Sequence, residues 1–105
     1  MIWPNDADGD VLRRLESQGF VFSEPHWIDF NVDFQKWPPP PEALERIQIA
    51  YPVAAIHKEE DEDPKYVLVQ FFQRLDYQFV VRVQADLSNI VRPFGGVCDS
   101  WGVLS

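Results

Sequence analysis

The stretch Trp27-Ile28-Asp29-Phe30-Asn31-Val32-Asp33-Phe34-Gln35 alternates strictly between apolar and polar residues after its first position. Successive side chains of a β-strand point to opposite faces, so this strand has one apolar and one polar face. The apolar face carries Ile28, Phe30, Val32 and Phe34, and the polar face carries Asp29, Asn31, Asp33 and Gln35. Such a strand is typical of an antiparallel or mixed sheet with one face open to water. The stretch therefore predicts a sheet that helices cover on one side only.

Six further elements are expected on either side of this strand. Apolar residues recur at helical spacing over residues 5–19, 42–51 and 77–93. Strands are expected over residues 53–58, 66–75 and 97–104, with Asp99, Trp101 and Val103 on one face of the last strand. Residues 79–83 are rich in β-branched side chains, as strands are, but the apolar stripe across the whole of 77–93 favours a helix.

The order of these elements predicts the fold. Without the first helix it is strand, helix, strand, strand, helix, strand, which is the split βαβ order of ferredoxin-like folds. We therefore predict an α+β ferredoxin-like sandwich, with a four-stranded antiparallel sheet (βαββαβ) and an extra N-terminal helix. A chain of 105 residues is the usual size of one domain, so residues 1–105 are expected to form a single domain.

The charge of the chain restricts its partners. Seventeen acidic and nine basic residues give a formal charge of -8, which repels nucleic-acid phosphates and anionic lipids. The same field accelerates encounter with a positively charged surface. We therefore expect a protein partner with a basic surface, and neither direct nucleic-acid binding nor membrane binding.

The chain is expected to act in the cytoplasm. Its only cysteine is Cys98, so an internal disulfide is impossible and a reducing compartment is the natural setting. Residues 1–6 have neither the basic residues nor the apolar run of an export signal. No stretch has the eighteen or more apolar residues that span a bilayer.

Two groups of polar residues are candidates for a protein interface. Asp29, Asn31 and Asp33 form a row on the predicted open face of the sheet, where a flat partner surface can dock. The run Glu59, Glu60, Asp61, Glu62 and Asp63 is expected to be a solvated hairpin loop that steers a basic partner. This run lacks the alternating ligands and central glycine of a calcium loop.

No signature of catalysis or of metal binding is found. His26, His57 and Cys98 lack the close spacing of zinc ligands, and we expect them to be ordinary strand or loop residues, with Cys98 buried as a small hydrophobic side chain. Phosphate loops, nucleophile elbows and zinc-protease motifs are also missing from the sequence. We therefore predict no catalytic residues, no metal and no cofactor.

Trp37 and residues 38–41, four consecutive prolines, are interpreted as a rigid connector, with a polyproline docking segment as the alternative.

The segments 5–15 (NDADGDVLRRL), 22–30 (FSEPHWIDF) and 95–102 (GGVCDSWG) together resemble the RraB family, regulators of ribonuclease E activity. The resemblance implies a ferredoxin-like sandwich that binds an endoribonuclease and restrains it without acting on RNA. Structural roles are expected for the family-motif residues, with the Trp101 indole covering the sheet and Gly102 permitting close backbone approach. These residues are Asp8, Gly9, Asp10, Leu15, Pro25, His26, Asp29, Phe30, Asp99, Trp101 and Gly102.

Three functions follow as hypotheses. The first is a small acidic regulator that binds and inhibits or modulates a ribonuclease E-like endoribonuclease. The second is an immunity or antitoxin protein for another basic partner, and the third is a small ligand-binding domain or enzyme that uses a cleft beside the sheet. The protein is expected to be a monomer or a weak dimer, because aromatic residues near the edges of the open face allow sheet-mediated pairing.

Overall fold

The computed structural model describes residues 3–103, which form three α-helices and one four-stranded antiparallel sheet. The elements follow in the order α1 (Ala7–Ser17), β1 (Pro25–Phe34), α2 (Pro41–Ala50), β2 (Ala55–Glu59), β3 (Tyr66–Arg74), α3 (Tyr77–Val91) and β4 (Gly96–Val103), with a 3-10 turn, Arg92–Phe94, before β4. Among the helices of this described part, none is both long and apolar enough to cross a membrane.

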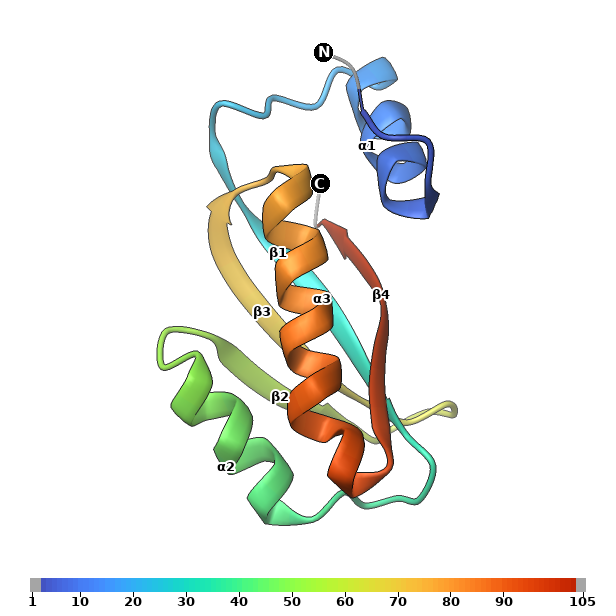
Figure 1. Ribbon diagram of the computed structural model, residues 1–105, viewed down its shortest axis with the longest axis vertical. Coiled ribbons are helices and arrows are strands. Elements are labelled where there is room, and N and C mark those ends of the chain that lie inside the picture. Colours follow the sequence, from blue (N-terminus) through green and yellow to red (C-terminus); the bar gives the residue numbers. More distant parts are fainter. Residues whose placement is uncertain (1–2, 104–105) are drawn as a thin grey trace.

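The sheet has the strand order β2-β3-β1-β4, so β1 and β3 are the two central strands. Helices α2 and α3 lie on the same face of the sheet, whereas α1 lies beyond one end of α3 (Figure 1). Every pair of neighbouring strands is antiparallel. The predicted α+β sandwich with the order βαββαβ after an extra N-terminal helix is confirmed.

The core lies between the sheet and α3. The alternation in β1 is confirmed, because Ile28, Phe30 and Val32 are fully buried. The ring of Phe30 meets the rings of Phe71 and Phe79 edge to face, with centroids 5.6 and 5.9 Å apart. Edge-to-face packing is a favourable arrangement of aromatic rings. This cluster joins both central strands to the helix layer.

The helix predicted over 77–93 is also confirmed. Asp76 caps its first turn, where the carboxylate accepts a hydrogen bond from the backbone amide of Phe79 at 2.7 Å. Val83 and Leu87 are fully buried against the sheet. The apolar stripe therefore decided the structure here, and the β-branched residues were accommodated within the helix.

The first helix is bounded by two local signals. Asp6 caps it by accepting a hydrogen bond from the Gly9 amide at 2.7 Å, so the helix begins at Ala7 and not at residue 5. Gly19 ends it with a φ of 83°, a left-handed conformation that favours glycine. The amide of Phe20 then donates to the Leu15 carbonyl at 3.0 Å, as in a Schellman motif.

The predicted alternation in the last strand is wrong at Asp99. The pairing of β1 with β4 shifts register beside Asn31 and Val32, so a bulge interrupts β4. A bulge adds one residue to one strand and reverses the sense of alternation beyond it. Cys98 consequently takes the buried side, and Asp99 is exposed instead of sharing a face with Trp101.

Candidate functional site

The sheet face opposite α2 and α3 carries no helix from any part of residues 3–103 (Figure 1). The strand register places on this open face alternate residues of each strand. They are Trp27, Asp29, Asn31 and Asp33 of β1; Tyr66, Leu68, Gln70, Phe72 and Arg74 of β3; Ala55, His57 and Glu59 of β2; and Val97, Ser100 and Gly102 of β4. We call this surface the open face.

The predicted acidic row lies on the open face along β1. Asp29, Asn31 and Asp33 are each half-buried, because neighbouring strands flank them on both sides. The side-chain amide of Gln70 on β3 donates to Asp29 Oδ1 at 2.9 Å. The central strand β1 fixes the backbone of the row, and the cross-strand hydrogen bond limits the movement of the Asp29 side chain.

Asp99 joins this row, although the sequence placed it with the family motif and on one face of the last strand with Trp101 and Val103. The β4 bulge brings its carboxylate beside that of Asp33. Burial raises the pKa of Asp33 above its usual value, and the negative charge of Asp99 raises it further. A positive charge placed beside the two carboxylates would act in the opposite direction and favour their ionised forms. The sequence alone could not reveal this pair, because it depends on the extra residue in β4.

An exposed aromatic pair lies at the other end of the open face. Trp27 of β1 is directly opposite Phe72 of β3, and their ring centroids are 5.3 Å apart. The two residues are 44% and 57% exposed. The alternation in β1 already placed Trp27 on the polar face, but its partner was not identified because the register between β1 and β3 cannot be read from the sequence.

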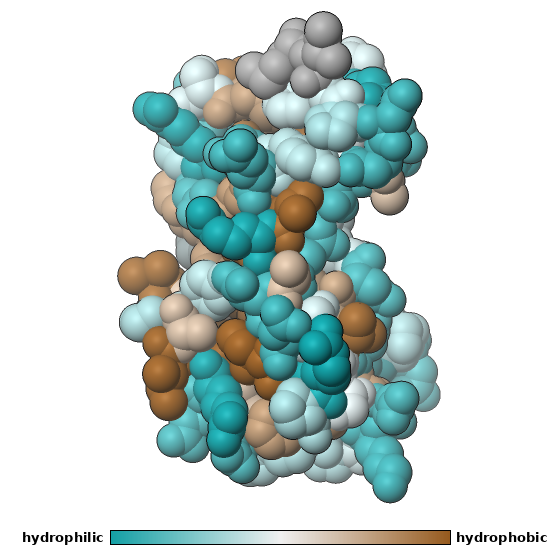
Figure 2. All heavy atoms as spheres, in the orientation of Figure 1, coloured by the Kyte–Doolittle hydropathy of each residue, from teal (hydrophilic) through white to brown (hydrophobic). Residues whose placement is uncertain are grey.

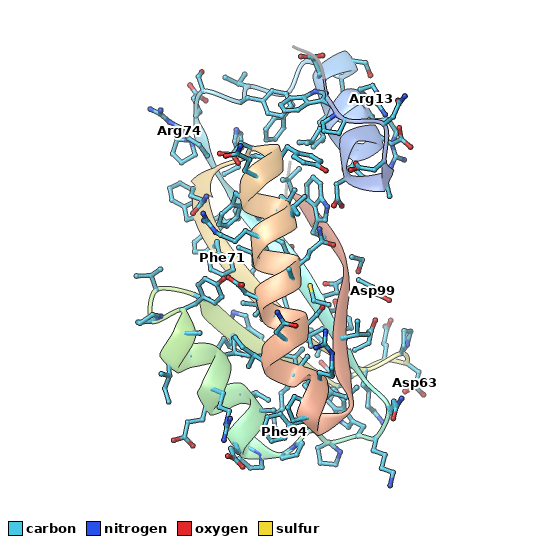
Figure 3. All side chains as sticks on the ribbon, in the orientation of Figure 1. Arg13, Asp63, Phe71, Arg74, Phe94 and Asp99 are labelled. Carbon is cyan, nitrogen blue, oxygen red and sulfur yellow. The ribbon has the colours of Figure 1, made fainter. Side chains whose placement is uncertain are left out.

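The acidic hairpin extends from the end of the sheet where Asp33 lies. Val32 pairs with Val67, and Glu59 pairs with Tyr66, so the hairpin follows directly on this end. Figure 3 shows Asp63 in the loop that projects to the right of the lower half of β4. The acidic row and the hairpin therefore lie toward one end of the molecule, and the aromatic pair toward the other.

The charges of the hairpin are only partly balanced. Glu60 pairs with Lys58 at 3.5 Å and accepts a hydrogen bond from the Trp37 indole at 3.3 Å. Asp63 pairs with Lys65 at 3.8 Å. Within residues 3–103, the carboxylates of Asp61 and Glu62 make no ion pair. The bond from Trp37 also ties the proline-rich connector to the hairpin.

The N-terminal family motif attaches α1 to the rest of the fold. Asp8 Oδ1 accepts a hydrogen bond from the Trp101 indole at 2.8 Å, and both Asp8 oxygens lie 3.2 Å from the Gln84 amide nitrogen. One carboxylate thereby joins α1 to α3 and β4. A Cβ atom at Gly9 would overlap the Pro4 carbonyl oxygen, so this position requires glycine.

Other motif residues also make local contacts. Asp10 pairs with Arg13, whose guanidinium also donates to the Trp3 carbonyl at 2.9 Å. Leu15 is half-buried against the core. His26 Nε2 lies 3.0 Å from the Val21 carbonyl oxygen.

The remaining motif positions lie on the sheet. Pro25 opens β1 opposite Arg74 and is exposed, whereas Phe30 is in the core. The expected close approach at Gly102 is wrong, because nothing lies within 4 Å of the position that a Cβ atom would take. Its neighbour Trp101 is half-buried and is held by the Asp8 carboxylate.

The potentially reactive side chains do not form a cluster. Cys98 is buried as predicted, and burial raises the pKa of its thiol to about 12. His57 is exposed on the edge strand β2. In the part of the chain that the structure describes, no three His, Cys, Asp or Glu side chains are arranged to hold a metal ion.

A shallow groove lies between α2 and α3 on the helix side. It is lined by Ala50, Tyr51, Asp86, Asn89 and Ile90. The Tyr51 hydroxyl donates to Asp86 at 2.6 Å, and burial followed by this hydrogen bond raises the pKa of the phenol above its usual value. This hydrogen bond joins the end of α2 to α3, so the Tyr51 hydroxyl and the Asp86 carboxylate are already paired with each other.

Comparison with known proteins identifies the family. No curated protein matches the chain. The family model described as "Regulator of ribonuclease activity B" (RraB) matches residues 5–103. The chain therefore belongs to the RraB family, whose members are non-enzymatic inhibitors that regulate ribonuclease (RNase E) activity by protein binding.

Proposed function

We propose that this protein binds a basic surface of a ribonuclease E-like endoribonuclease through the acidic end of its open face, and thereby restrains the enzyme. The observation that carries the proposal is the distribution of charge on that face. Asp29, Asp33 and Glu59 lie on it, with Asp99 beside them, and its only Lys or Arg is Arg74 at the far end. Charged surfaces of opposite sign accelerate encounter and fix the orientation of binding.

Inhibition follows from occupancy and requires no chemistry by the regulator. A basic surface of a ribonuclease is suited to RNA or to acidic partner proteins, because both present negative charge. A regulator that covers this surface competes with them. The formal charge of -8 keeps the regulator itself away from RNA.

The setting that we propose is the cytoplasm, where RNase E acts, with the regulator as a monomer or weak dimer. The acidic hairpin has a separate task in this scheme. Asp61 and Glu62 are exposed, so they act over a distance and steer the approach of the enzyme. Asp33 and Asp99 lie closer to the sheet and contact the bound partner.

Binding and inhibition can be measured together with the purified RNase E-like enzyme of the same cell. We expect the wild-type protein to bind at low ionic strength and to slow cleavage of a fluorescent RNA, with the association rate falling as salt is added. Asp33→Asn is expected to weaken binding about tenfold, which corresponds to about 1.4 kcal/mol.

The matched control is Glu45→Gln on α2, which also removes one negative charge but lies in the helix layer. It is expected to leave binding almost unchanged. Equal effects of the two variants would show that only the total charge matters. Absence of wild-type binding at both low and high salt would refute the proposed function itself.

A further inference from the structure

We propose that the open face recognises a partner segment with two different groups, a large apolar side chain that packs on Trp27 and Phe72 and a basic group that lies over Asp33 and Asp99. This inference rests on the proposed function and adds to it the chemistry of the bound segment. The bound segment is part of a protein. The negative charge of the chain disfavours nucleic acid, and a free cation would make no contact with the aromatic pair.

The aromatic pair has the properties of an anchoring site. Trp27 and Phe72 lie on the two central strands, and their rings are tilted by 52°. Both side chains remain about half exposed, although aromatic residues are normally buried where they can be. Aromatic side chains that become buried in an interface often provide a large part of its binding energy. An apolar partner side chain can contact both rings and remove their exposed surface from water.

The exposed apolar residues of the helix layer do not form such an aromatic pair. Figure 2 shows apolar atoms at the surface over α2 and the loop that follows it. The exposed residues there include Ile49 and Val53, which are aliphatic. The nearby charges of Glu42 and Arg46 already pair with each other at 2.8 Å. Glu45 on the same helix is a single further acidic residue, whereas the open face brings the carboxylates of Asp33 and Asp99 together.

The two halves of the proposed site are separated by a fixed distance. Trp27 and Asp33 are six positions apart on the same strand, which corresponds to about 20 Å at ~3.3 Å per residue. Arg74 lies beyond the aromatic pair, opposite Pro25, and would repel a basic group at that end. The partner must therefore present its apolar and basic groups about 20 Å apart, with the basic group toward the hairpin.

The test uses the RNase E-like enzyme as the binding partner and measures association and dissociation rates. Phe72→Ala is expected to weaken binding about 20-fold or more, mainly through faster dissociation, and the loss should persist at high salt. Phe72→Tyr retains the ring and should bind almost as well as the wild type. Ile49→Ala, at a residue that is 71% exposed on α2, is the matched control and should have little effect.

The double variant Phe72→Ala/Asp33→Asn tests whether the contacts are separate. Sites more than about 10 Å apart usually act independently, so the two fold-changes should multiply. Circular dichroism and thermal unfolding of each variant establish that it is folded. If the wild type binds but Phe72→Ala resembles Ile49→Ala, the anchor is refuted while the proposed function stands.

A second copy of this chain is the competing occupant of the open face. In that case, sedimentation would show a wild-type dimer that Phe72→Ala converts to a monomer, without loss of enzyme binding. That result would also overturn the inference. A wild-type protein that does not bind the enzyme at all would refute the proposed function and, with it, this extension.

Discussion

At the scale of single residues, Asp33 combines a cost in stability with a proposed role in binding. Its carboxylate is partly removed from water on the open face and lies beside the carboxylate of Asp99. Both circumstances disfavour its ionised form, and in the unfolded chain neither applies. A charge maintained against such a cost is typical of a functional site.

This cost predicts how Asp33→Asn changes the pH dependence of stability. The folded-state pKa of Asp33 is raised above 3.8, so the native state binds its proton more tightly than the unfolded state does. The contribution of Asp33 is therefore unfavourable at neutral pH and fades as the pH falls through the folded-state pKa. We expect Asp33→Asn to be more stable than wild type at pH 7, and to lose this advantage in acid. Urea unfolding across this range measures the difference, and an advantage that does not change with pH would contradict the assignment.

At the scale of elements, α1 depends on a small number of polar contacts. Asp8 is half-buried and accepts hydrogen bonds from Trp101 of β4 and Gln84 of α3. Leu12 provides the fully buried apolar contact of this helix. The N-cap residue Asp6 also accepts a hydrogen bond from the Tyr77 hydroxyl of α3 at 2.5 Å, so two carboxylates and a narrow apolar stripe join the helix to the sandwich.

Asp8→Ala should loosen α1 without unfolding the sandwich. It leaves the Trp101 indole N–H without its acceptor, which costs about 1–3 kcal/mol for a buried donor. Hydrogen exchange should become faster at α1 amides, whereas the central amides of α3 should be affected much less. Asp8→Asn retains a side-chain oxygen as acceptor and serves as the matched control. Equal acceleration in α1 and α3 would mean that the first helix does not open separately.

The elements that could be predicted from the sequence are those whose pattern is local. Strand β1 was recognised from the alternation of apolar and polar residues, and helix α3 from apolar residues at helical spacing. Each pattern lies within one element and specifies which of its sides is buried. The bulge in β4 was missed, because an extra residue is defined by the partner strand and leaves no periodic signal. The spatial requirement at Gly9 was missed because the obstructing atom is the carbonyl oxygen of Pro4, five positions earlier, and only the folded backbone brings the two positions together.

The candidate site shows the same division. The row Asp29, Asn31 and Asp33 was predicted because all three residues lie on one strand. Phe72 and Asp99 were missed because each reaches the site from a neighbouring strand, by a register that only the folded sheet defines. Their contribution to binding remains a prediction.

At the scale of the whole molecule, the family match confirms the predictions of a RraB-type regulator and of inhibition without catalysis. The match spans residues 5–103, far beyond the three segments that carried the resemblance. The charge of -8 is a property of the complete chain, and it bears on encounter with a partner more than on the fold.

Cys98 offers a measure of the cooperativity of the whole fold. Its side chain is 6% exposed, and burial raises its thiol pKa to about 12, so the folded protein contains almost no reactive thiolate at pH 8. We expect thiol reagents to modify it only after global opening, with a labelling rate that rises with urea in parallel with unfolding. The modification of free cysteine under the same conditions is the control. Rapid labelling in the absence of urea would contradict this burial.

The one-sided covering of the sheet separates the residues that maintain the fold from those that meet a partner. Every second side chain of β1 packs into the core, and the intervening ones face outward. Replacements among the outward residues leave the packed interior intact, so binding preference can change in evolution with little risk of misfolding. The same separation recommends the domain as a scaffold, in which libraries at the outward positions of β1 and β3 would select new ligands on an unaltered framework.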